Sequence, residues 1–120
     1  MSLLCFKNAS LAREEVKNTY NLSWRDFSEI LLTTPPGNSG KIMLPYFMPE
    51  ITPLILDPRV FRFGGLTEDE MKGNVRAIAE AQIMAMYLHS NWIGQRPKSI
   101  LVTAGGSGNR GLLKKSFLKF

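Results

Sequence analysis

The 120-residue sequence predicts a single α/β domain. Short apolar runs have the length of buried strands, and they alternate with longer stretches in which apolar residues recur at helical spacing. This alternation is typical of folds that layer helices on a sheet. The apolar content of 44% is sufficient for a modest core. We expect strands at residues 2–6, 41–44 and 99–103, and helices at 11–20, 24–32 and 68–93 and from 112 onward.

Two short helices are expected in the first third of the chain. Ser10 has the character of an N-cap for the first of them. Ser23 is the expected N-cap of the second, and Asp26 stands where it can complete a capping box. In the second helix the apolar side chains repeat at helical spacing and are expected to face the core: Trp24, Phe27, Ile30 and Leu31.

The middle of the chain is predicted to be mostly connections around one strand. Residues 33–40 contain two prolines and two glycines and predict a loop before the strand at 41–44. Pro45 and Pro49 favour an irregular extended course after that strand. Residues 58–65 are interpreted as a further exposed connection.

The longest helix is predicted between Thr67 and Gly94. Thr67 has the position of an N-cap, with Glu70 completing a capping box, and Gly94 is the expected C-terminal stop. The Ala-rich centre is apolar on most sides, so the helix is expected to be sandwiched between other elements. Arg76 and Glu80 are i,i+4 partners. One buried stripe is expected to contain Met71, Val75, Ile78, Ala85, Leu88 and Trp92.

Composition restricts the classes of function. The net charge of +5 favours anions such as ATP or nucleic acid, or it reflects nothing more specific than a basic C-terminal tail. The single histidine excludes a multi-histidine metal site formed by this chain alone, so no metal ligands are predicted. Cys5, the only cysteine, is expected to be buried, and its lack of an internal partner fits a cytoplasmic protein. No apolar run has the length of a membrane span, and the N-terminus is not built like a signal peptide.

A glycine-rich turn after the run 99–103 is the candidate functional site. Gly105 and Gly106 lack side chains that would keep a nucleotide from the backbone, while Ser107 and Asn109 offer short polar groups beside them. The turn fits neither the P-loop pattern nor the G-x-G-x-x-G fingerprint. A tight turn without any ligand is therefore an equal alternative. No constellation of catalytic residues is visible in the sequence.

Several separated segments occur in one order that resembles the C-terminal domain of D-xylulose kinases, in the FGGY carbohydrate kinase family. The resemblance extends from Leu3 to about Leu113. The segments are Leu3–Glu14, Met43–Phe47, Pro49–Pro53, Asn74–Ala77 with Glu80-Ala-Gln82, and Val102–Arg110. Ala104 stands where the family usually has glycine.

The resemblance implies that residues 1–120 form part of an actin-like, ribonuclease-H-like ATPase domain, on its ATP side. It implies transfer of the γ-phosphoryl group of ATP to the 5-hydroxyl of D-xylulose with Mg²⁺. Nucleotide contacts would fall on Gly105, Gly106, Ser107 and Asn109, and the catalytic aspartate of the family would lie upstream of Ser2. These 120 residues alone are therefore expected to be inactive.

The partners expected are ATP, D-xylulose in the full-length enzyme, and the remainder of the kinase chain. Open sheet edges also favour self-association. The alternative is a non-catalytic module that uses its basic tail on an acidic or nucleic-acid partner.

Overall fold

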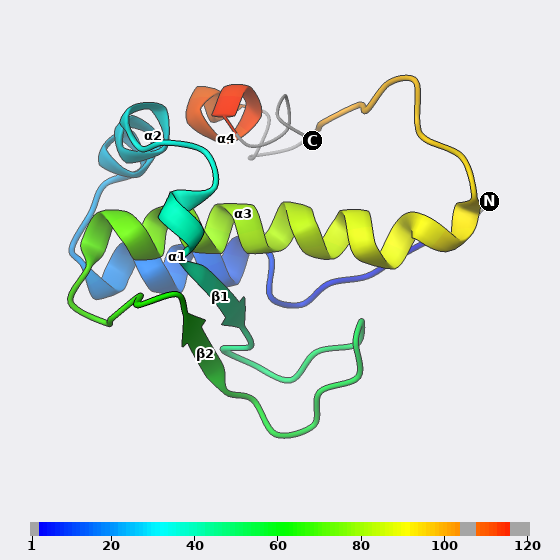
Figure 1. Ribbon diagram of the computed structural model, residues 1–120, viewed down its shortest axis with the longest axis horizontal. Coiled ribbons are helices and arrows are strands. Elements are labelled where there is room, and N and C mark those ends of the chain that lie inside the picture. Colours follow the sequence, from blue (N-terminus) through cyan, green and yellow to red (C-terminus); the bar gives the residue numbers. More distant parts are fainter. Residues whose placement is uncertain (1–2, 104–107, 116–120) are drawn as a thin grey trace.

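The structure is a computed structural model, and it describes residues 3–103 and 108–115. A long helix, α3, lies at the centre of the molecule, and the other elements surround it (Figure 1). The elements are α1 (Ser10–Thr19), α2 (Trp24–Thr33), the 3-10 turn Asn38–Gly40, β1 (Ile42–Pro45), β2 (Val60–Phe63), α3 (Met71–Ser90), the 3-10 turn Asn91–Ile93 and α4 (Arg110–Lys115).

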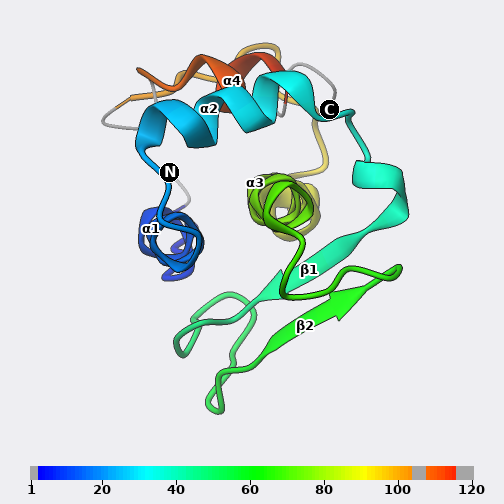
Figure 2. The same cartoon turned by 90° about the vertical axis from the view of Figure 1, so that its left-hand side faces the viewer.

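Helix α3 is sandwiched, as its apolar centre predicts. In the view along its axis, α1 and α2 lie on one side and the two strands lie on the other (Figure 2). Every residue from Asn74 to Ala81 is buried. The predicted buried stripe does not continue to the C-terminal end of the helix, because Leu88 is 67% exposed and Trp92 is 63% exposed. The contribution of α3 to the core therefore ends at Ile83.

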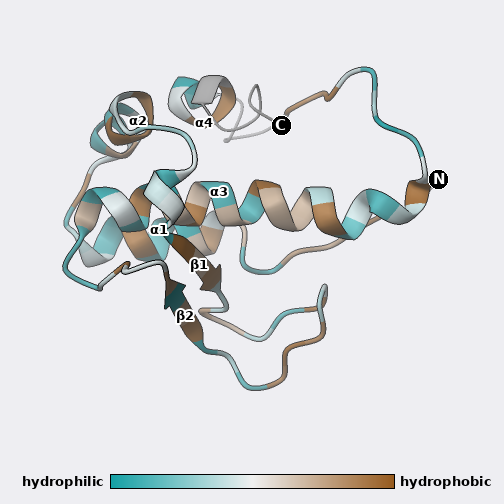
Figure 3. Ribbon diagram, viewed as in Figure 1, coloured by the Kyte–Doolittle hydropathy of each residue, from teal (hydrophilic) through white to brown (hydrophobic). Residues whose placement is uncertain are grey.

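The strands β1 and β2 form an antiparallel two-stranded sheet, with Ile42 opposite Phe63 and Pro45 opposite Val60. Figure 3 shows β1 as a hydrophobic strand. The strand expected at 41–44 is confirmed. The expectation of a mere connection at 58–65 is wrong, because Val60–Phe63 forms β2. Gly64 ends β2 with φ +70°, and a Cβ there would lie 2.2 Å from the carbonyl oxygen of Gly40.

Two predicted strands are not formed. Residues 3–6 and 99–103 have irregular backbone, and the sheet of the described residues contains β1 and β2 only. Both runs have strand-forming composition, but a strand also requires a hydrogen-bonded neighbour. Cys5, expected to be buried, is exposed in the first of these runs.

The N-caps of the first three helices agree with the sequence in one case and differ in two. Ser23 and Asp26 form the predicted capping box, with Asp26 N to Ser23 Oγ and Ser23 N to Asp26 Oδ2 both 3.1 Å. Helix α1 has Ala9, not Ser10, as its N-cap. The predicted cap at Thr67 is wrong, because α3 begins at Met71 and the Thr67 hydroxyl donates to the Asp69 carboxylate.

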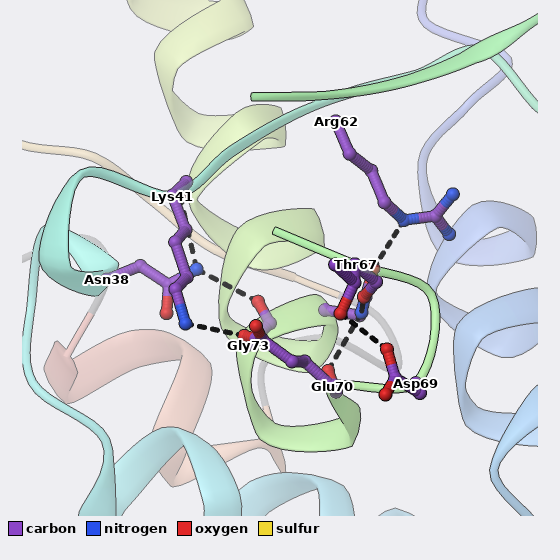
Figure 4. Close-up of polar contacts among 8 residues, drawn as sticks. Asn38, Lys41, Arg62, Thr67, Asp69, Glu70 and Gly73 are labelled. Atoms are coloured by element: carbon purple, nitrogen blue, oxygen red, sulfur yellow. Dashed lines mark hydrogen bonds and ion pairs between the residues drawn. The ribbon is translucent and has the colours of Figure 1, made fainter. Parts of the chain in front are cut away.

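The start of α3 is held by a polar network in place of the expected capping box (Figure 4). The buried Asn74 amide donates to the carbonyl oxygens of Thr67 and Glu70, both at 2.8 Å. Its Oδ1 accepts a bond from Arg62 Nε at 2.7 Å. Glu70 occupies the N-cap position, but its carboxylate makes no cap hydrogen bond and pairs with Lys41 Nζ at 2.5 Å.

At the other end of α3, Gly94 has φ +73° after the turn Asn91–Ile93, which confirms it as the stop. Among the helices that the structure describes, none is long and apolar enough to cross a membrane.

Candidate functional site

Of the four predicted site residues, the structure describes Asn109. Gly105, Gly106 and Ser107 lie outside the described residues. Asn109 precedes α4 and caps it, because its Oδ1 accepts the N–H of Leu112 at 3.0 Å and its carbonyl accepts the N–H of Leu113 at 3.1 Å. Among the described residues, the Asn109 amide nitrogen has no hydrogen-bond partner.

Asn109 borders a cavity of about 1110 Å³. The start of α1 and one side of α2 form two of its walls, and residues within 102–103 and 108–112 form the third. Segments that lie far apart in the sequence therefore line the same cavity. The charged, polar or aromatic side chains along it are Ser10, Arg13, Trp24, Arg25, Ser28, Glu29, Thr103, Asn109 and Arg110.

The charge balance of this cavity favours an anionic ligand. Three arginines line it, Arg13, Arg25 and Arg110, against Glu29 as the one acidic residue among its described lining residues. Arginine presents a planar fork of N–H donors that matches phosphate oxygens. Burial lowers the pKa of the Arg13 guanidinium, which nevertheless remains charged near neutral pH. A bound anion would offset the desolvation of that charge.

An indole ring lies at the same cavity. Trp24 is 46% exposed, so the expectation that it faces the core is wrong, whereas Phe27, Ile30 and Leu31 are buried as expected. The indole contacts Phe27 edge-on, with 5.5 Å between the ring centroids. Lys17 Nζ lies 5.3 Å from the centroid of the indole ring. A partly exposed indole of this kind can stack on a planar aromatic ligand.

Gly111 sets the position of α4 beside the cavity. A Cβ at this residue would lie 2.5 Å from the backbone oxygen of Ser28 and 2.9 Å from Leu31 Cβ. The Gly111 N–H donates to Ser28 Oγ at 3.3 Å. The absence of a side chain at Gly111 therefore allows α4 to pack directly on α2.

We expect Gly111→Ala to destabilise the fold by about 1–3 kcal/mol, the usual cost of inserting a methyl group into a close contact. Urea unfolding followed by circular dichroism measures the effect. Gly108→Ala is the matched control, because a Cβ at Gly108 meets no atom within 4 Å. Equal stability of the two variants would contradict the close packing of α2 and α4.

Most of this site cannot be identified from the sequence alone. Arg13, Arg25 and Trp24 belong to the helices expected at 11–20 and 24–32, and nothing local distinguishes their side chains from ordinary surface or core positions. The segment 102–103 does reach the site, although not as the end of a strand. In the part of the chain that the structure describes, no group of three or more His, Cys, Asp or Glu side chains could hold a metal ion.

Comparisons with known proteins agree with the resemblance. No family model matches the chain. The xylulose kinases of Rattus norvegicus and Mus musculus are each 38% identical to it in an alignment of 120 positions, which covers 95% of this chain and 22% of theirs. A probable D-xylulose kinase A of Aspergillus fumigatus is 32% identical in an alignment of 147 positions, which covers 95% of this chain and 26% of that protein.

A solved structure extends this agreement to the fold. The crystal structure of xylulose kinase from Bifidobacterium adolescentis superposes with a TM-score of 0.74 at 20% identity, covering 90% of this chain and 22% of that one. The chain is thus homologous to a segment of xylulose kinases, and it spans about a fifth to a quarter of the length of the relatives that it matches.

Proposed function

We propose that residues 1–120 are the ATP-side part of the C-terminal domain of a xylulose kinase, and that the cavity beside Asn109 receives ATP. The observation that carries the proposal is the meeting of the predicted Asn109 with three arginines and an indole at one cavity. Homology to xylulose kinases supports it, because a kinase must bind a nucleotide that is both anionic and aromatic.

Each group at the cavity has a role that its chemistry suits. The Trp24 indole would stack on adenine, and the arginine guanidinium groups would pair with phosphate oxygens. The Asn109 amide would donate to the nucleotide while its Oδ1 continues to cap α4.

The reaction proposed for the whole enzyme is transfer of the ATP γ-phosphoryl group to the 5-hydroxyl of D-xylulose. Mg²⁺ would neutralise phosphate charge in that reaction. The described residues at this cavity include one carboxylate, on Glu29, which is not a set of ligands for a protein-held Mg²⁺. The proposal therefore assigns ATP contacts to this segment and no metal ligands.

We expect these 120 residues alone to produce no ADP in a coupled assay with ATP and D-xylulose, because the chain spans about 22% of the length of its mammalian relatives. Xylulose-dependent ADP production by this polypeptide would contradict that expectation. Catalysis is thus assigned to the complete kinase, and ATP binding is the property to be tested on the present chain.

Asn109→Ser separates ligand binding from helix capping. Serine caps helices about as well as asparagine, so the stability is expected to stay within about 0.5 kcal/mol of the parent. The amide donors are lost, and we expect ATP affinity measured by calorimetry to fall about tenfold. Asn109→Ala removes both the amide donors and the cap. Besides the loss of ATP affinity, it is therefore expected to lower the free energy of unfolding by about 1 kcal/mol. Unchanged ATP affinity in Asn109→Ser would exclude this residue from the nucleotide site.

Salt dependence separates this proposal from the basic-tail alternative. Contacts driven by charge alone with a nucleic acid weaken steeply as salt is raised. Binding that also uses stacking on Trp24 and the Asn109 amide is expected to weaken less.

Self-association through the outer edges of β1 and β2 stays a prediction, which light scattering at high protein concentration can measure.

A further inference from the structure

Gln82, at the middle of α3, connects the core helix to the start of α1. Its Nε2 donates to the carbonyl oxygen of Asn8 at 2.9 Å and to that of Ala9 at 2.6 Å. Its Oε1 accepts a hydrogen bond from an Nη of Arg13. One half-buried amide thus contacts both the backbone that begins α1 and the side chain of Arg13, a residue that lines this cavity and also, with Gln82, a second one.

These contacts hold both the backbone and the side chain of Arg13. The N–H of Arg13 bonds to the carbonyl oxygen of Ala9 at 3.1 Å, in the first turn of α1. Because Gln82 also binds that Ala9 oxygen, it holds the turn from which the Arg13 side chain departs. Its bond to the guanidinium then selects one orientation of a side chain that is otherwise flexible.

Arg13 retains donors for a ligand in this orientation. A guanidinium carries five N–H donors. Among the described residues, the partner of the Arg13 side chain is Gln82 alone. A neutral amide acceptor holds the guanidinium without neutralising it, whereas a carboxylate at residue 82 would compensate the charge that a phosphate needs.

We infer that Gln82 is a positioning residue that orients the Arg13 guanidinium toward the phosphate chain of ATP. The inference rests on the proposed function, since it takes the cavity as the nucleotide site. It gives a role to Gln82, the last residue of the segment Glu80-Ala-Gln82 that carries part of the resemblance. It also joins α3, which does not itself border this cavity in the described residues, to the binding of the ligand.

Calorimetric titration of Gln82→Leu with ATP and with adenosine tests the inference. Leucine is similar in size but cannot hold the guanidinium, so ATP affinity is expected to fall about tenfold, as for the weakening of a charge-assisted hydrogen bond. Adenosine has no phosphate, and its affinity is expected to remain within about twofold. The exposed Gln95→Leu is the matched control and is expected to change neither affinity.

A second measurement uses Arg13→Ala as the background. If Gln82 acts through Arg13, adding Gln82→Leu to Arg13→Ala causes no further loss of ATP affinity. Equal losses for ATP and adenosine, or additive losses in the double variant, would show a structural role only and would overturn the inference. ATP binding by the parent with no change in Gln82→Leu would overturn it as well. Failure of the parent chain to bind ATP would overturn the proposed function itself.

Discussion

Arg76→Met is expected to destabilise the protein by about 3–5 kcal/mol, because it leaves a buried carboxylate without its cation. The Arg76 side chain is fully buried, and its Nε lies 2.8 Å from Glu80 Oε1. A guanidinium Nη also donates to the carbonyl oxygen of Leu31 at 3.1 Å. In the variant, the Glu80 carboxylate keeps its bond from the N–H of Gly37, at 2.8 Å, but has lost its charge partner.

Two further variants test whether the buried charge left behind causes this loss of stability. The double variant Arg76→Met with Glu80→Met is expected to recover much of the loss, because no uncompensated charge stays buried. Arg59→Met, which breaks an ion pair to Asp57 between side chains 67% and 78% exposed, is expected to cost less than about 1 kcal/mol. Urea unfolding at pH 7 measures all of them. A cost below about 1 kcal/mol for Arg76→Met would mean that the pair is not buried.

Glu50→Gln is expected to cost about 2–4 kcal/mol, because a buried carboxylate accepts four hydrogen bonds there. Glu50 Oε1 accepts the N–H groups of Lys7 and Ile51 at 2.7 and 2.8 Å. Its Oε2 accepts the N–H and the Nδ2 of Asn8, both at 2.9 Å. In glutamine an NH₂ group replaces one of the two carboxylate oxygens. Two of the N–H donors would then face another donor and lose their acceptor. The exposed Glu14→Gln is the control and is expected to have little effect.

The same carboxylate predicts a dependence of stability on pH. Burial by itself raises the pKa of Glu50, but the N–H donors of Lys7, Asn8 and Ile51 together outweigh burial and hold the pKa below its ordinary value. A lowered pKa stabilises the fold above the unfolded value of about 4.3, and the contribution is lost as the pH falls through the folded value. The gap in unfolding free energy between parent and Glu50→Gln should stay constant from about pH 7 to 5 and shrink below that. A gap that widens on acidification would contradict this assignment.

The fold could be predicted where local chemistry decides it. The capping box at Ser23 and Asp26 and the stop at Gly94 depend on neighbouring residues, and both are confirmed. Strands depend on distant partners, so the apolar runs at 2–6 and 99–103 predicted strands that the described residues do not form. The cap predicted at Thr67 is wrong because the Thr67 hydroxyl donates to the Asp69 carboxylate and α3 begins only at Met71.

Of the three walls of the candidate site, only the one formed by residues near Asn109 could be predicted from the sequence. Asn109 was identified from the glycine-rich turn, and it does border the cavity. Arg13 and Trp24 reach the same cavity from helices whose local sequence signals only amphipathic packing. The contact between Arg13 and Gln82 spans 69 positions of sequence, which no periodicity can reveal.

The most direct test of the central claim is an ATP titration followed through the two indole N–H signals in an NMR correlation spectrum of the labelled chain. Trp24 borders the proposed ATP cavity, whereas Trp92 follows the far end of α3 and does not line it. Trp92→Phe assigns the two signals. We predict that the Trp24 signal shifts saturably with ATP while the Trp92 signal stays in place. A Trp24 signal that ignores ATP, or two signals that shift alike, would contradict a nucleotide site at this cavity.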